Sequence, residues 1–358
     1  MWALALVAMA TGFSSLPNGH VEQLGHVATP LPYEALGSID VGTGESSIFL
    51  FNGTRYLLDN IFCGYIDHYG KWNATFASHS YARIRNFDTG EVVANVTETV
   101  ATSFVSAFVD HRATGDVLWL SALDEDRCRK QCGTGVLAIR STDLETFTRS
   151  SAIPTVHTCN TEVARVYTPP PPGGLPPHRY VMILEPFTFM VNDNADGDLS
   201  RGWVAAAGSK APHAPSGGPS IRYEGGKYYV ITGGKTVVVC RSADLGMTDA
   251  WNCTTMINPT GKGGAAGPGD AAVAPYVGFA KDAARKHFAV MQQNVSDWDW
   301  NSNDADVCCT GGSSPSFLVW GASTQGHKPD LPPGSPSCTN AIGRANVTLE
   351  VLLDSFFA

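Results

Sequence analysis

The clearest pattern in the chain spans residues 217–251 and reads GGPSIRYEGGKYYVITGGKTVVVCRSADLGMTDAW. It contains three short runs rich in aromatic and β-branched residues, at 220–223, 227–231 and 236–240, and such runs favour β-strands. A Gly-Gly pair separates each run from the next, and glycine accepts the positive φ angles that tight hairpin turns require. The segment therefore predicts three antiparallel strands joined by two tight turns.

The end of this segment is repeated elsewhere in the chain. Arg241 begins the sequence RSADLGMTDAW, and Arg140 begins the similar sequence RSTDLETF. A hairpin unit that recurs along 358 residues is typical of a β-propeller. Further units are expected at 45–93, 104–147, 161–184 and 270–321, and the apolar residues 347–353 are expected to form the strand that closes the ring. We therefore predict an all-β propeller of about five blades in a single domain spanning 33–358.

The hairpin followed by an RSxDLxxW tail resembles the five-bladed propeller glycosidases of the class around glycoside hydrolase families 43 and 32. Sialidases are also propellers, but their repeats have the form SxDxGxxW, and the Asp-Leu pair here favours the five-bladed class. The resemblance covers most of the chain as a repeat pattern, so it concerns the fold rather than the activity. It implies two carboxyl groups that face a central channel, one to protonate the leaving oxygen and one to attack or to activate water.

The resemblance places these carboxyl groups on the innermost strands of different blades. Glu162 begins the inner strand of the third blade, where the family has a Glu, and is the expected general acid. Asp40 or Glu45, at the start of the first blade, is the expected base or nucleophile. Asp110, at the far end of its strand, would be the third carboxylate, which tunes the acid. Asp270 begins the inner strand expected in the fifth blade and is a further catalytic candidate.

Each of these acids also has a structural interpretation. Glu162 fits a buried ion pair with Arg165 or Arg222, and both arginines are otherwise expected to bind substrate. Asp40 and Glu45 fit surface turns. The distant position of the second-blade acid favours an alternative in which the propeller binds a glycan or a protein partner without catalysis.

A second group of candidates lies at 297–306, where tryptophans alternate with carboxylates and amides. Aromatic rings stack on sugar C–H groups, and carboxylates and amides bind hydroxyl groups. The alternative is a structured loop held by Cys308 and Cys309. The residues expected to bind a sugar here are Trp298, Trp300, Asn303, Asp304 and Asp306.

Residues 192–198 (NDNADGD) place oxygen ligands at alternating positions before a glycine, which is half of a calcium-binding loop. Trp203 stands where the twelfth-position Glu would be. Calcium is therefore a candidate cofactor, with a plain Asx-rich turn as the alternative. No other metal or cofactor is expected.

The charge and the N-terminal sequence indicate which class of partner and which cellular compartment to expect. The net charge is −9 and no run of Lys or Arg occurs, so nucleic acid is not an expected partner, whereas a carbohydrate is. Residues 1–18 contain a short apolar run at 2–10 followed by small residues, and are expected to be a secretory signal peptide. A buried first strand is the alternative. No later segment is long enough for a transmembrane helix.

Six N-x-S/T acceptor sequences and nine cysteines fit a secreted, glycosylated and disulfide-bonded protein. Cys240 and Cys253 are expected to join adjacent strands, and Cys128 and Cys132 to close a loop. The sequence thus predicts a secreted glycoside hydrolase, with an inactive binding propeller or another enzyme on the same fold as alternatives. The acceptor asparagines are Asn52, Asn73, Asn95, Asn252, Asn294 and Asn346.

Overall fold

The structure is a computed structural model of the chain. It describes residues 34–41, 43–61, 81–100, 102–123, 133–158, 160–166, 179–214, 218–233, 237–245, 251–257, 301–308, 315–323 and 339–357. For 34–45, 61, 103, 233, 257, 301–308, 317–323 and 339–344 only the backbone is described. The expected signal peptide at 1–18 lies outside the described residues.

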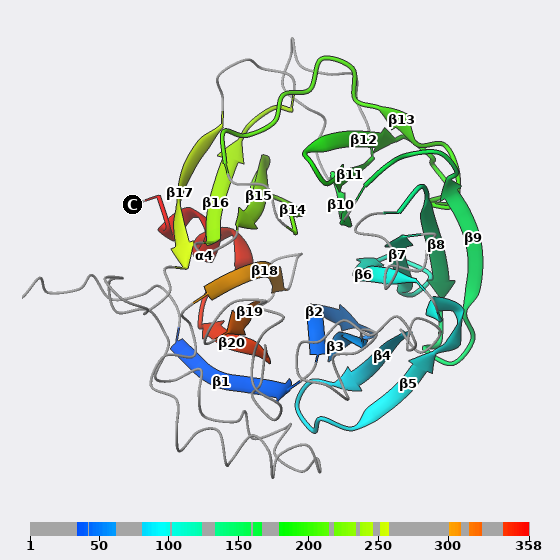
Figure 1. Cartoon of the computed structure of the whole chain (residues 1–358), viewed down its shortest axis with the longest axis horizontal. Coiled ribbons are helices and arrows are strands. Elements are labelled where there is room, and N and C mark those ends of the chain that lie inside the picture. The colour runs from blue at the N-terminus through cyan, green and yellow to red at the C-terminus, as the bar shows by residue number, and fades with distance from the viewer. Residues whose placement is uncertain are drawn as a thin grey trace, which may run out of the picture. The chain divides into compact units, whose positions relative to one another are not determined.

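The strands form five four-stranded antiparallel sheets, called blades one to five here (Figure 1). In blade three the pairing starts with Thr161 opposite Leu184 and continues without a break, whereas several pairings in other blades contain a register shift. The strands, given in the order of pairing within each sheet, are β2 (Thr43–Phe51), β3 (Thr54–Ile61), β4 (Tyr81–Asn86) and β5 (Val92–Val96) in blade one; β6 (Ser103–Asp110), β7 (Val117–Leu123), β8 (Val136–Ser141) and β9 (Thr148–Ile153) in blade two; β10 (Thr161–Arg165), β11 (Tyr180–Leu184), β12 (Thr188–Asn192) and β13 (Val204–Ala205) in blade three; β14 (Ser220–Glu224), β15 (Lys227–Gly233), β16 (Val237–Ser242) and β17 (Asn252–Ile257) in blade four; and β18 (Asn301–Cys308), β19 (Ser316–Ser323), β20 (Thr339–Ala345) and β1 (Glu34–Val41) in blade five.

Within the compact unit Leu31–Ala358, one strand from each blade takes part in a closed ring. β2 contacts β6, β6 contacts β10, β10 contacts β14, β14 contacts β18, and β18 contacts β2. Five sheets that extend outward from a ring of inner strands make a β-propeller, which confirms the fold predicted from the repeats. The described residues contain one short α-helix, α4 (Leu349–Ser355), and one 3-10 turn, η2 (Thr97–Thr99). Neither helical segment has the length and apolar character that a membrane span would need.

The first of the two predicted Gly-Gly turns is present, whereas the second, at 233–234, runs into residues 234–236, which lie outside the described part of the chain. Gly225 and Gly226 have φ angles of 54° and 78°, and they join β14 to β15 with Glu224 opposite Lys227. A side chain at both central positions would be strained in this left-handed region, so the Gly-Gly pair selects the turn.

The repeated RSxDL motif is a turn that connects the third and fourth strands of a blade. In blade two, the hydroxyl oxygen of Ser141 accepts hydrogen bonds from the amides of Asp143 and Leu144, at 3.3 and 3.0 Å. The Asp143 carboxylate in turn accepts from the amides of Glu145 and Thr146, at 2.9 and 2.7 Å. Leu144 and its blade-four counterpart Leu245 are buried in the cores between blades. The motif therefore serves the fold and not the chemistry of a site.

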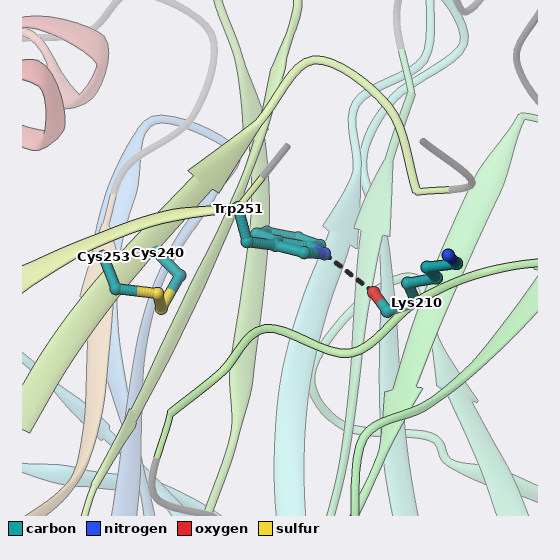
Figure 2. The surroundings of a disulfide bond; sticks show 4 residues. All are labelled: Lys210, Cys240, Trp251 and Cys253. Carbon is teal, nitrogen blue, oxygen red and sulfur yellow. Dashed lines mark hydrogen bonds between the residues drawn. A yellow bond between two sulfur atoms is a disulfide. The ribbon is translucent and has the colours of Figure 1, made fainter. Parts of the chain in front are cut away.

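The outer edge of blade four is held by the predicted disulfide between Cys240 and Cys253, which lie opposite each other on β16 and β17 (Figure 2). Trp251, at the end of the motif, donates its indole N–H to the Lys210 carbonyl oxygen at 2.7 Å (Figure 2). Its ring also stacks on Phe189 of blade three. The tryptophan thus fixes the end of one blade against the blade before it. Cys128 and Cys132 lie outside the described residues.

The ring closes differently from the prediction. Residues 347–353 do not form the closing strand; they contribute to α4. Leu349, Leu352 and Leu353 are buried at helical spacing, and Thr348 caps the helix N-terminus, so the period is that of a helix rather than a strand. Closure comes instead from β1, which pairs with β20.

Two further features concern the inner strand of blade five and the C-terminal helix. The inner position is held by β18 and not by the strand expected at 270–275, which lies outside the described residues. The helix α4 packs on blade four, where the Asp354 carboxylate accepts hydrogen bonds from Lys227, Tyr229 and Arg241, each at 2.7 Å. These charged contacts and the buried leucines anchor the C-terminal segment to blade four.

Candidate functional site

At the end of the ring where the inner strands begin, many buried side chains are polar. The inner strands of blades one to four start at this end, since hydrogen bonds join Asn60 to Val105, Ser106 to Thr161 and Glu162 to Ile221. The second strand of each of these blades finishes there because the pairing is antiparallel. Burying polar groups costs free energy unless they find hydrogen-bond partners or a ligand. This group, called the strand-start cluster here, comprises Ser46, Ser47, Asn60, Asn160, Thr161, Glu162, Ser220 and Arg222.

Glu162 lies near the start of β10 and joins blade three to blade four. Its Oε2 accepts a hydrogen bond from the Ile221 amide at 3.2 Å, and its Oε1 accepts one from the Arg222 guanidinium. The Glu162 and Arg222 side chains are only 4% and 7% exposed. Of the two arginines proposed from the sequence as partners, Arg222 is therefore the one paired with Glu162.

Asp110 and Arg165 meet at the opposite end of the inner strands. Asp110 Oδ1 accepts from Arg165 at 2.5 Å, and its Oδ2 accepts from Arg112 at 2.6 Å and from the Tyr180 hydroxyl at 3.1 Å. Burial, with a further contribution from Asp110, raises the pKa of Tyr180 to about 12. Residues 162 and 165 are an odd number of positions apart, so their side chains leave β10 on opposite faces. The structure therefore does not bring Asp110 together with Glu162.

Two residues that the sequence analysis did not single out lie next to Glu162. The Glu185 amide donates to the Asn160 carbonyl oxygen at 3.0 Å, which extends the β10–β11 pairing by one step. Asn160 Nδ2 donates to Glu185 Oε2 at 2.8 Å. The Thr158 hydroxyl donates to the carbonyl oxygens of Asn160 and Glu185 at 3.0 and 2.9 Å. In the sequence, Asn160 lies two positions before Glu162, a spacing that places both side chains on one face of a strand. Glu185 directly follows the apolar run that ends at Leu184. These two patterns could have indicated Asn160 and Glu185.

The remaining candidates are placed by their backbone or fall outside the described residues. Glu45 is on β2, an inner strand, near its start. Asp40 is on β1, the outermost strand of blade five, and not on an inner strand. The inner strand β18 carries three of the expected sugar-binding residues, Asn303, Asp304 and Asp306. The candidates outside the described residues are Asp270, Trp298 and Trp300.

The acidic loop at 192–198 is packed against arginines. Arg112 donates to the carbonyl oxygens of Asp196 and Gly197 at 3.0 and 2.9 Å. Arg201 donates to the carboxylates of Asp196 and Asp198 at 2.7 and 2.6 Å. Gly197 has a φ angle of +67°, and an added Cβ would approach Arg112 Nη2 to 2.3 Å. In the described part of the chain no cluster of three or more His, Cys, Asp or Glu residues is arranged to hold a metal ion, and calcium at this loop stays a prediction.

No protein-family model and no curated protein matches the chain. Among solved structures, a GH43 protein from Bacillus licheniformis is similar with a TM-score of 0.43 and 10% identity, over 87% of this chain and 54% of that one. The Bacteroides ovatus xyloglucan PUL protein GH43B gives a TM-score of 0.49 and 9% identity, over 87% of this chain and 53% of that one. The native arabinanase of Bacillus subtilis gives 0.45 and 10%, over 87% and 96%. This chain thus spans about half the length of the first two proteins, and the similarity concerns the arrangement of the backbone.

Proposed function

We propose that this protein is a secreted, glycan-active propeller, and specifically a glycoside hydrolase that acts at the strand-start end of its central ring. The observation that carries the proposal is the strand-start cluster, in which hydroxyl, amide and charged side chains of several blades gather around the beginnings of the inner strands. Such groups suit a ligand with many hydroxyl groups. Glycoside hydrolysis needs two carboxyl groups across the scissile bond, and the cluster contains Glu162.

The second carboxyl group of this mechanism would come from another inner strand. Glu45 on β2 and Asp304 or Asp306 on β18 belong to inner strands that contact each other. In the proposed reaction one carboxyl group protonates the leaving oxygen, and the other attacks the anomeric carbon or activates water.

A second candidate function is glycan binding without hydrolysis. Both carboxylate oxygens of Glu162 already accept hydrogen bonds from blade four, and the side chain is buried. A carboxylate held in this way acts as an acceptor and stabilises the interface between blades. This observation favours binding over proton donation by Glu162.

Secretion is part of the proposal. The Cys240–Cys253 disulfide suits an oxidising compartment. Four of the six glycosylation sequences lie in described segments, and their asparagines are all exposed, as attachment of a glycan requires. These asparagines are Asn52, Asn95, Asn252 and Asn346.

The experiment begins with a screen of neutral and acidic polysaccharides and of nitrophenyl glycosides for turnover and binding. Glu162→Gln is then compared with Glu145→Gln, a matched control at an exposed acid in the blade-two turn. If Glu162 is the proton donor, hydrolysis of an unactivated glycoside falls by about 10²–10⁴-fold, and a substrate with a good leaving group suffers less. Equal, small losses on both substrates would show that Glu162 is not the acid. Binding without turnover, retained in Glu162→Gln but lost in Trp298→Ala, would establish the second function.

A further inference from the structure

Blade three carries a second acid on the same face as Glu162. Glu162 lies opposite Ile183 in the β10–β11 pairing, and the backbone hydrogen bond between Glu185 and Asn160 adds the next pair in this direction. Because side chains alternate along a strand, Asn160 and Glu162 share one face, and Glu185 shares it with them. Diagonal neighbours across such a pairing are about 7–8 Å apart, so one ligand can reach both acids.

The two acids differ in which oxygen atoms are available. Both carboxylate oxygens of Glu162 accept hydrogen bonds from blade four. Glu185 is only half-buried, and its Oε2 is held by Asn160. Among the described residues nothing donates a hydrogen bond to Glu185 Oε1. Glu185 is therefore an oriented carboxylate with one oxygen that no described residue occupies.

The hydrogen bond to Glu185 fixes which way the side-chain amide of Asn160 is oriented. A carboxylate only accepts hydrogen bonds, so the amide nitrogen of Asn160 must be the atom that faces Glu185. The amide oxygen Oδ1 then faces elsewhere, and it is buried without a hydrogen-bond partner in the described part of the chain. Asn160 is 8% exposed. A buried acceptor without a donor is costly, and a bound ligand that supplies the donor explains it.

We propose that Glu185 Oε1 and Asn160 Oδ1 form a pair of acceptors that binds hydroxyl groups of a neutral sugar unit, with Asn160 also positioning Glu185. The proposal rests on the proposed function above and assigns part of its substrate site. Two acceptors without a donor select hydroxyl groups and disfavour carboxylate, sulfate or phosphate groups on the same sugar unit. Glu185 is then the acid of blade three that contacts the ligand. The buried ion pair of Glu162 and Arg222 supports the site without contacting the ligand.

The first test needs no known substrate. The folded protein is treated with a water-soluble carbodiimide and glycine ethyl ester, and the modified carboxyl groups are located by peptide mass spectrometry. Glu185 and the exposed control Glu145 should react, whereas Glu162 should not. An unreactive Glu185 would overturn the proposal, because the carboxylate would then have no accessible oxygen. The labelling is repeated with the methyl glycosides of the neutral hexoses and pentoses, and with any polysaccharide that the screen finds to bind. A sugar that binds should protect Glu185 and leave Glu145 reactive.

The second test uses variants on the glycan that binds. Glu185→Gln should weaken its binding by about tenfold or more, since hydrogen bonds to a charged acceptor are strong, and Glu145→Gln should not. Asn160→Leu keeps the side-chain volume and should weaken binding without lowering the thermal midpoint, because the variant also removes the buried unpaired oxygen. A lower midpoint with unchanged affinity would assign Asn160 a structural role only. A glycan that binds without protecting Glu185 would overturn this inference and leave the proposed function standing, whereas a protein that binds no glycan at all would overturn the proposed function and this subsite with it.

Discussion

Replacing Glu162 by Gln tests the ion pair between blades three and four. The Glu162 and Arg222 side chains are 4% and 7% exposed, so the variant would leave a buried guanidinium without the charge of Glu162. Removing one partner of a buried ion pair costs about 3–5 kcal/mol. With the usual unfolding entropy of about 2 cal/mol/K per residue, such a loss lowers the thermal midpoint of a domain of this size by roughly 4–7 °C. The free energy of unfolding is measured by urea titration, with tryptophan fluorescence as the signal.

A double-mutant cycle separates the charge from the packing. Arg222→Met alone leaves the Glu162 carboxylate buried without its guanidinium, and it should also be strongly destabilising. In Glu162→Gln/Arg222→Met neither charge remains, and replacement of a whole buried pair is often close to neutral. The double variant should therefore lose less stability than the sum of the two single variants, by about 2 kcal/mol. Additive losses, or a loss below about 1 kcal/mol in Glu162→Gln, would refute a buried and coupled pair.

Burial raises the pKa of Glu224 from 4.5 to about 7, against the attraction of Arg222 and with the help of Glu350. The folded chain then holds this proton more tightly than the unfolded chain, so the free energy of unfolding should fall as the pH rises from about 4.5 to about 7. Urea titrations of Glu224→Gln at the same pH values should not show this fall. Equal pH dependence in wild type and variant would contradict the assignment. Replacing Cys240 and Cys253 together by Ser should lower the free energy of unfolding by about 3 kcal/mol, because the bridge closes a loop between residues 13 positions apart and so restricts the unfolded chain. An unchanged unfolding free energy would show that the bridge constrains little. Endoglycosidase treatment of protein from a eukaryotic secretory host should lower its mass, since the described acceptor asparagines are exposed. An unchanged mass would exclude glycosylation in that host.

Local patterns were sufficient to predict most of the fold. The Gly225-Gly226 turn and the RSxDL motif each fix their geometry within a few residues, so the sequence alone indicates them. The closure of the ring was not predictable in this way. β1 pairs with β20 across about three hundred residues, with Glu34 opposite Arg344, and no local spacing encodes such a contact. The apolar run at 347–353 suits a strand or a helix equally, and only its packing against blade four decides for a helix.

The site was predictable to a smaller extent. Glu162 stands out because it lies near the start of an expected inner strand, and it does belong to the strand-start cluster. Its partner could not be chosen from the sequence, because Arg165 is close in the chain whereas Arg222 is sixty residues away. The pleat explains the outcome, since Glu162 and Arg165 face different neighbouring blades. The sequence did not indicate a functional role for Glu185, because this residue follows the end of a strand and precedes a proline. An acid at such a position is ordinarily interpreted as part of a turn.

The register of the inner strands limits which acids can act together. The inner strands of blades one to four run in the same direction, so residues at similar distances from their starts lie at the same level of the ring. Glu162 is the second residue of β10 and Glu45 is the third residue of β2, which places both near the strand-start end. Asp110 is the last of the eight residues of β6, and its contacts with Arg165 place it at the other end. A catalytic pair is therefore to be sought among Glu162, Glu185, Glu45 and the β18 acids Asp304 and Asp306, while Asp110 belongs to the ion pairs that join blades two and three.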